Sequence, residues 1–146
     1  MGELVGIAIR DAKRAAMREL QSATVTPDAG VADDFRGKPG KRQVTLLSAD
    51  VWDTVCAELN SDLPWTIRRA NLLVAGIDLP KAAGETIQVG PVTLRVTMET
   101  DPCSRMDEQH DGLRAALTPD WRGGVCCEVL SGGEISIGDS VLLETA

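Results

Sequence analysis

Residues 85–99, ETIQVGPVTLRVTME, decide the fold class of this 146-residue chain. They are rich in β-branched residues, which favour strands, and Gly90-Pro91 interrupts them in the middle. We therefore expect two short strands joined at this dipeptide. Other segments share the same character, and they indicate further strands over residues 3–10, 19–26, 42–48 and 71–79.

The end of the chain carries a hairpin pattern. Residues 124–131 and 134–144 flank Gly132-Gly133, a pair that a two-residue turn between antiparallel strands accepts. Several short strands separated by turns are typical of a β-barrel or a sandwich. The sequence thus predicts one mostly β, mostly antiparallel domain over residues 1–146.

Two segments have helical periodicity. Residues 48–60 place Val51, Trp52, Val55, Cys56 and Leu59 on one apolar stripe, and Ser48 or Asp50 can cap the first amides. A second signal covers residues 103–117, where Gly112 can divide the helix. So few helices do not alternate with the strands often enough for a parallel α/β sheet.

Composition excludes several classes of function. Apolar residues make up 43% of the chain, and no apolar run is long enough for a transmembrane helix. We expect a cytoplasmic protein without an export signal. The net charge of −7 argues against nucleic acid or an anionic membrane as a partner.

The positive charge is concentrated in one short loop of an otherwise acidic chain. Arg36, Lys38, Lys41 and Arg42 lie within seven residues. Such a loop suits a small anionic ligand better than a polyanion. A solvated surface loop is the alternative, and composition alone does not separate the two.

Cys103 differs from the other cysteines, Cys56, Cys126 and Cys127. It follows an expected strand, begins an expected helix and precedes Arg105 by two residues. Helix-start amides and a guanidinium both favour the thiolate, the form that attacks electrophiles or binds metals. Cys103 is therefore the candidate nucleophile or metal ligand.

The remaining candidate groups have plainer interpretations. Cys56 and Cys127 fall on apolar faces and are expected in the core, whereas Cys126 is ambiguous. His110, the single histidine, is expected to be a partly solvated helix residue. On a continuous helix it lies about 10 Å from Cys103, too far for a catalytic pair. One histidine and no Cys-x-x-Cys argue against a zinc site.

An ordered series of segments resembles the MOSC domain family, named for the C-terminal part of molybdenum cofactor sulfurases. The segments are residues 30–48, 68–79, 84–90, 101–105 and 123–141. Pro102, Cys103 and Arg105 match the family's Pro-Cys-x-Arg. Arg69 and Asn71 match its Arg-Glu-Asn, with Ala70 in place of Glu. Gly30, Val31 and Asp34 match a Gly-hydrophobic-x-Gly-Asp turn, with Asp33 in place of the second Gly.

The resemblance implies a fold and a cofactor. The fold is a small pyruvate-kinase-like β-barrel with two or three peripheral helices. The cofactor is the pterin-based molybdenum cofactor, molybdopterin. By the same resemblance, Cys103 is the catalytic residue and metal ligand. The residues expected to hold the pterin or its phosphate are Lys38, Arg42, Arg69, Asn71 and Arg105.

Two functions follow from the resemblance, with a third alternative. The first is a molybdenum-dependent reductase of N-hydroxylated compounds. The second is a carrier that passes sulfur or cofactor from Cys103 to a partner enzyme. Either one needs a redox or sulfur-transfer partner protein. The third alternative is a relative that has lost the ligand.

Overall fold

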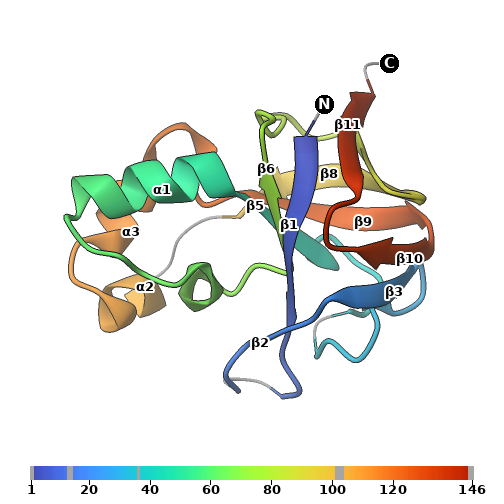
Figure 1. Cartoon of the computed structure of the whole chain (residues 1–146), viewed down its shortest axis with the longest axis horizontal. Coiled ribbons are helices and arrows are strands. Elements are labelled where there is room, and N and C mark those ends of the chain that lie inside the picture. Colours follow the sequence, from blue (N-terminus) through green and yellow to red (C-terminus); the bar gives the residue numbers. More distant parts are fainter. Residues whose placement is uncertain (1, 13–14, 36, 101–103, 145–146) are drawn as a thin grey trace.

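A computed structural model describes residues 2–12, 15–35, 37–100 and 104–144. Seven strands close into a barrel, because β1 pairs with β6 on one side and with β11 on the other (Figure 1). The order around the barrel is β1 (Gly2–Ile9), β11 (Ser140–Glu144), β7 (Thr86–Val89), β8 (Val92–Glu99), β9 (Val125–Ser131), β5 (Val44–Ser48) and β6 (Leu72–Ala75). The expected mostly β barrel is confirmed.

Most neighbouring barrel strands are antiparallel, but β5 and β6 run parallel. A parallel pair needs a crossover connection. That connection contains α1 (Ala49–Glu58) and the 3-10 turn η1 (Trp65–Arg68). The expected helix is therefore present, and the Ser48 hydroxyl accepts a hydrogen bond from the Val51 amide at 3.2 Å as its cap.

The second helical signal forms two short helices, as Gly112 suggested. They are α2 (Ser104–Gln109) and α3 (Leu113–Leu117), with Gly112 in the left-handed conformation between them. The 3-10 turn η2 (Pro119–Trp121) follows. In Figure 1 all three α-helices lie on one side of the barrel. No helix in the described ranges is both long and apolar enough to cross a membrane.

The expected hairpin at Gly132-Gly133 is wrong. β10 (Gly133–Ser136) pairs with β3 (Ser22–Thr26), which also pairs with β4 (Gly30–Val31). The reason is that β8 occupies one edge of β9, while β5 and the Gln43 side chain occupy the other. Gly132 instead lets the chain approach β3, since a Cβ there would lie 2.3 Å from the Val25 carbonyl oxygen. The expected strand over 19–26 is divided between β2 (Arg18–Glu19) and β3.

Two apolar clusters hold the fold together. The first fills the barrel interior. The second lies between the helices and the outer face of the barrel, and it contains Leu47, Trp52, Val55, Ala70, Met106, Leu113 and Leu117. Successive side chains of β5 point to opposite faces, so this strand contributes to both clusters: Val44 and Leu46 point inward, and Leu47 points to the helices.

Candidate functional site

Asn71 joins three strands at the outer face of the barrel. It is 5% exposed, and its Oδ1 accepts hydrogen bonds from the Thr45 amide at 3.0 Å and the Thr45 hydroxyl at 3.3 Å. Its Nδ2 donates to the Ala8 carbonyl at 3.2 Å. These bonds give Asn71 a framework role where β6 begins. The predicted cofactor contact at Asn71 remains a prediction.

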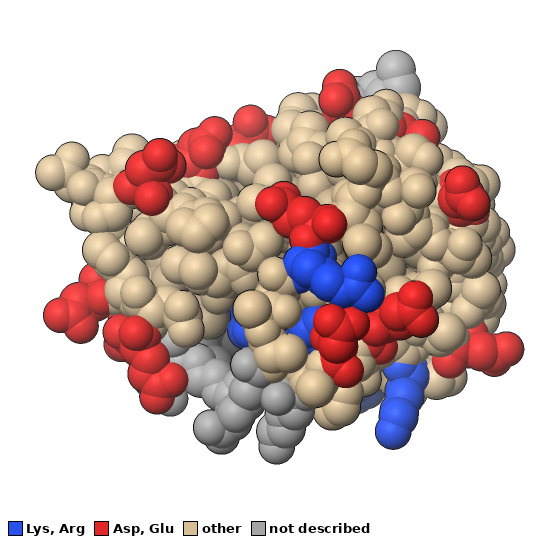
Figure 2. Space-filling model, turned by 60° about the horizontal axis from the view of Figure 1, so that its bottom comes forward, with Lys and Arg blue, Asp and Glu red and all other residues tan. Residues whose placement is uncertain are grey.

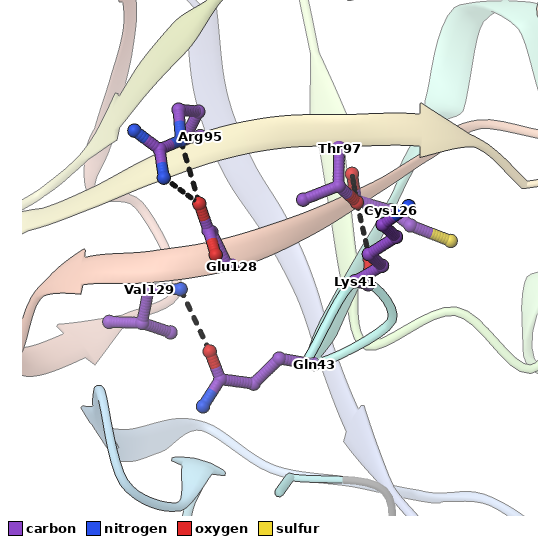
Figure 3. Close-up of polar contacts among 7 residues, drawn as sticks. All are labelled: Lys41, Gln43, Arg95, Thr97, Cys126, Glu128 and Val129. Atoms are coloured by element: carbon purple, nitrogen blue, oxygen red, sulfur yellow. Dashed lines mark hydrogen bonds and ion pairs between the residues drawn. The ribbon is translucent and has the colours of Figure 1, made fainter. Parts of the chain in front are cut away.

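Gln43 holds the basic loop, residues 37–42, against the barrel. Its Nε2 donates to the carbonyls of Pro27, at 2.7 Å, and Gly37, at 3.1 Å. Its Oε1 accepts from the Val129 amide at 2.8 Å, as Figure 3 shows. One buried side chain thus ties both ends of a charged loop to β9.

Thr97 connects the same loop to Cys126. The Thr97 hydroxyl lies within hydrogen-bond distance of the Lys41 carbonyl and, at 3.1 Å, of the Cys126 carbonyl (Figure 3). The Cys126 sulfur is directed away from Gln43 in this view and lies 3.2 Å from the Thr100 hydroxyl. Cys126 is 1% exposed, so its thiol is enclosed at the end of β8.

Arg68 fixes the point where β8 ends and β9 begins. Its Nε donates to the Gly123 carbonyl at 3.1 Å, and its Nη2 donates to the Thr100 carbonyl at 2.6 Å. Gln43, Arg68 and Asn71 are buried polar side chains that bond to distant segments, and we term these three residues the polar seam.

The predicted cations differ in their surroundings. Lys38 and Arg42 are exposed, and no ion pair between described residues uses either of them. Arg69 is half-buried with φ +67°, and its Nη2 donates to the Ala15 carbonyl at 2.6 Å. Figure 2 shows Lys and Arg side chains gathered in the middle of one face, with carboxylates around them.

Cys103 and the Arg105 side chain lie outside what the structure describes. In the sequence, the described residues on either side of Cys103 are Thr100 and Ser104. Its predicted role, like that of Arg105, stays a prediction. Thr100, the last described residue before Cys103 in the sequence, belongs to the network that Arg68 and Cys126 form.

Both departures from the family pattern have a structural explanation. Asp33 stands where the family has glycine, and it keeps the left-handed conformation, with φ +68°, that a glycine would adopt. Asp tolerates this region better than most residues. Ala70, in place of Glu, is 3% exposed inside the second apolar cluster. The turn and the loop therefore remain intact.

The other candidate groups are buried or partly buried. Burial raises the pKa of the Cys127 thiol, so it stays protonated in the barrel core. Cys56 is half-buried at the second cluster, with its sulfur 3.8 Å from the Leu63 carbonyl. His110 is half-buried, as expected, and its Nε2 lies 3.4 Å from the Ser61 hydroxyl.

Sequence reasoning missed Arg68 and Gln43. Both adjoin residues that the family pattern highlighted, but their importance comes from partners far along the chain. Arg68 binds Gly123, 55 residues away, and Gln43 binds Val129, 86 residues away. A buried polar residue cannot be distinguished from an exposed one by such local patterns.

The structure also has a cleft of about 560 Å³. It lies between the first turns of α1, residues 78–81 and residues 120–125. Of the predicted cofactor residues whose side chains the structure describes, Lys38, Arg42, Arg69 and Asn71, none lines it. Among the described residues, no group of three or more His, Cys, Asp and Glu could hold a metal ion.

A model of the MOSC domain family matches residues 24–142, which is most of the chain. The protein therefore belongs to the MOSC domain family, which is associated with the molybdenum cofactor. No curated protein matches it in sequence.

Solved structures share this fold. The YuaD protein from Bacillus subtilis is similar with a TM-score of 0.78 and 17% identity, over 97% of this chain and 94% of that one. YiiM from Geobacillus stearothermophilus has a TM-score of 0.78 and 15% identity, over 99% and 76%. YiiM from Escherichia coli has a TM-score of 0.72 and 12% identity, over 99% and 70%. At these identities the likeness shows the fold alone.

Proposed function

We propose that this protein binds the molybdenum cofactor beside the polar seam and uses Cys103 as the thiolate ligand of the metal. We further propose that it reduces N-hydroxylated compounds. Membership of the MOSC family carries this proposal. The exposed cations Lys38 and Arg42, which form no ion pair with the described residues and lie on a loop held by Gln43, support it.

The donor set suits the chemistry of the cofactor. A cofactor phosphate needs cations and directed donors, and Arg is favoured because its planar group can bind phosphate through two hydrogen bonds. Lys38, Arg42, Arg69 and Arg105 are the residues we assign to this anion. When bound, the cofactor supplies a redox-active molybdenum with soft dithiolene sulfurs, with which a protein thiolate is compatible.

The chain's own residues would then hold and orient the cofactor. Gln43 keeps the cationic loop against β9, so Lys38 and Arg42 do not have to be ordered when the anion arrives. Asn71 keeps the start of β6 in register with β5. Cys103 would be the only functional thiol, and an electron-donor protein is the partner this activity needs.

The second candidate is a carrier that holds sulfur or cofactor on Cys103 for a partner enzyme. It needs the same thiolate and the same cations but no substrate reduction. A persulfide on Cys103 without molybdenum would favour it.

The test is to express the chain in a host that makes the cofactor, then measure molybdenum by elemental analysis and persulfide by mass spectrometry. We expect molybdenum in the wild type and its loss in Cys103→Ser, because a hydroxyl is a harder and less acidic ligand. Cys56→Ser, the matched control at a half-buried thiol, should keep the metal. Persulfide without molybdenum would overturn cofactor binding and favour the carrier. If the protein contains neither molybdenum nor persulfide, both candidate functions are overturned.

A further inference from the structure

The cleft beside the first turns of α1 has the size of a small-molecule site. Its volume is about 560 Å³, and such sites usually measure about 300–1,000 Å³. One part of its lining is apolar or aromatic and consists of Val51, Leu79, Pro80, Trp121 and Val125. Another part is charged and consists of Asp78, Lys81, Asp120 and Arg122. An apolar wall beside a few charged groups is typical of a site for a small organic ligand that carries charge.

Trp121 gives the cleft a fixed aromatic surface. Its side chain is half-buried and packs against the cluster that fills the barrel interior. The turn that carries it is hydrogen-bonded on both sides of the indole. The Arg122 amide donates to the Pro119 carbonyl at 3.1 Å, and the Gly124 amide donates to the Trp121 carbonyl at 3.0 Å. Because the ring is already held, it loses little freedom when a ligand contacts it.

The backbone of the same turn adopts a costly conformation. Asp120 and Trp121 are both left-handed, with φ +52° and φ +57°. Asp tolerates this region, but a residue as bulky as Trp rarely adopts it. Strain of this kind clusters at sites that bind ligands, and here it falls on two successive residues that line the cleft.

The charges of the cleft favour a cation. Arg122 is paired with Glu58, with 2.8 Å between Nη1 and Oε1, and this pair has no net charge. Of the other lining charges, Asp78 and Asp120 are negative and Lys81 is positive, which leaves one net negative charge. The whole chain carries −7, so its field also attracts cations. The indole adds to this preference, because the face of an aromatic ring attracts a cation, and that of Trp does so most strongly.

We propose that this cleft binds a small organic cation with a flat apolar body, such as a protonated aromatic amidine or arylalkylamine. The apolar body contacts Trp121 and Leu79, and the positive charge lies near Asp78 and Asp120. Such a ligand needs neither molybdenum nor Cys103, so its binding goes beyond the proposed function and is tested separately from it.

The experiment is a titration of the whole chain with benzamidine at pH 7, where the amidine is protonated. Nitrogen-15 NMR follows the indole N–H signals of the three tryptophans, and Trp121→Phe identifies the signal of Trp121. Trp52 and Trp65 do not line the cleft, so their signals are internal controls. We expect the Trp121 signal to move until it saturates, while the other two stay in place.

Two related ligands show whether the positive charge matters. Benzamide is neutral and benzoate is an anion, and both have nearly the size and shape of benzamidine. Each should bind more weakly than benzamidine by about threefold or more, because an exposed charge pair contributes an effect of this order.

Four variants show whether the lining charges matter. Asp78→Asn and Asp120→Asn should each weaken benzamidine binding about threefold. Asn tolerates the left-handed region as Asp does, so the turn at residue 120 is kept. Lys81→Met should strengthen binding about threefold, because it removes a repulsion. Asp111→Asn, the control, removes an exposed charge that does not line the cleft and should leave binding unchanged.

Three results would overturn the proposal. The first is a Trp121 signal that stays in place up to the solubility limit of benzamidine. The second is binding of benzamide or benzoate as tight as that of benzamidine. The third is an equal loss of binding in Asp111→Asn and Asp78→Asn, which would mean that only the net charge of the protein acts. A protein without molybdenum or persulfide would defeat the proposed function but would not change this titration.

Discussion

The barrel interior and the polar seam hold the same strands together by different physics. The interior is aliphatic and its side chains are almost fully buried. The seam consists of Gln43, Arg68 and Asn71, which are equally hidden but bond to backbone groups of distant segments. Apolar contacts are non-directional, whereas each seam bond needs one partner at one place.

This difference predicts how each region responds to substitution. A substitution that shortens an interior side chain should lower the stability of the protein in proportion to the volume removed. A substitution in the seam should lower the stability of the protein because it leaves polar groups without partners, and it should also disturb the predicted site. The following predictions test that division.

The largest effect is expected in the interior. Leu94→Ala, at a fully buried position of β8, should lower the free energy of unfolding by about 2–5 kcal/mol. Guanidinium chloride titration measures the loss. Leu142→Ala, at a side chain 43% exposed on β11, is the control and should change stability by less than about 0.5 kcal/mol. Equal losses would contradict the placement of the core.

Asn71→Ala should have the next largest effect. It leaves the Thr45 amide and the Ala8 carbonyl without their partner, which costs about 1–3 kcal/mol. Denaturant titration against Gln88→Ala provides the comparison, because Gln88 makes similar bonds at a half-buried position that water can reach. If the two variants lose the same stability, the seam has no special role.

Arg42→Ala should leave stability unchanged and weaken cofactor retention roughly tenfold, because one charge-assisted hydrogen bond is lost. Molybdenum remaining after dialysis is the measurement. Arg95→Ala removes an equal charge that is already paired with Glu128, so it should retain the metal. Equal retention in both variants would remove Arg42 from the site.

The smallest effect is expected at the surface pair of Glu58 and Arg122. A hydrogen bond from Arg122 holds the pKa of Glu58 below its ordinary value of 4.5. The pair therefore stabilises the fold above that value, and the contribution disappears as the pH falls through the lowered pKa. Glu58→Gln should slightly lower the thermal midpoint at pH 7 and match wild type in strong acid. A difference that grows on acidification would refute this.

Local sequence patterns were sufficient for most elements. Ser48 and the apolar stripe after it specify α1, Gly90-Pro91 separates β7 from β8, and Gly112 separates α2 from α3. Each of these features depends on residues a few positions apart. The family motifs likewise depend on short segments in order, so the family and the barrel could be predicted before the structure.

Pairing between distant segments could not be predicted in this way. Gly132-Gly133 suits a hairpin locally, but β8, β5 and Gln43 occupy the edges of β9, so β10 pairs with β3. The parallel contact between β5 and β6 also depends on how the crossover packs. Whether a strand edge is available is a property of the closed barrel.

The candidate site likewise has features that the sequence predicts and features that only the folded chain shows. Its chemical residue types, a cysteine followed by an arginine and a cationic loop, are visible in the sequence because chemistry requires those types. The burial of Arg68 and the enclosure of Cys126 beside Thr100 appear only in the folded chain. Burial and hydrogen bonding between segments arise when the barrel closes, since that is the step that brings the ends of β8 and β9 to η1 and the basic loop to β9.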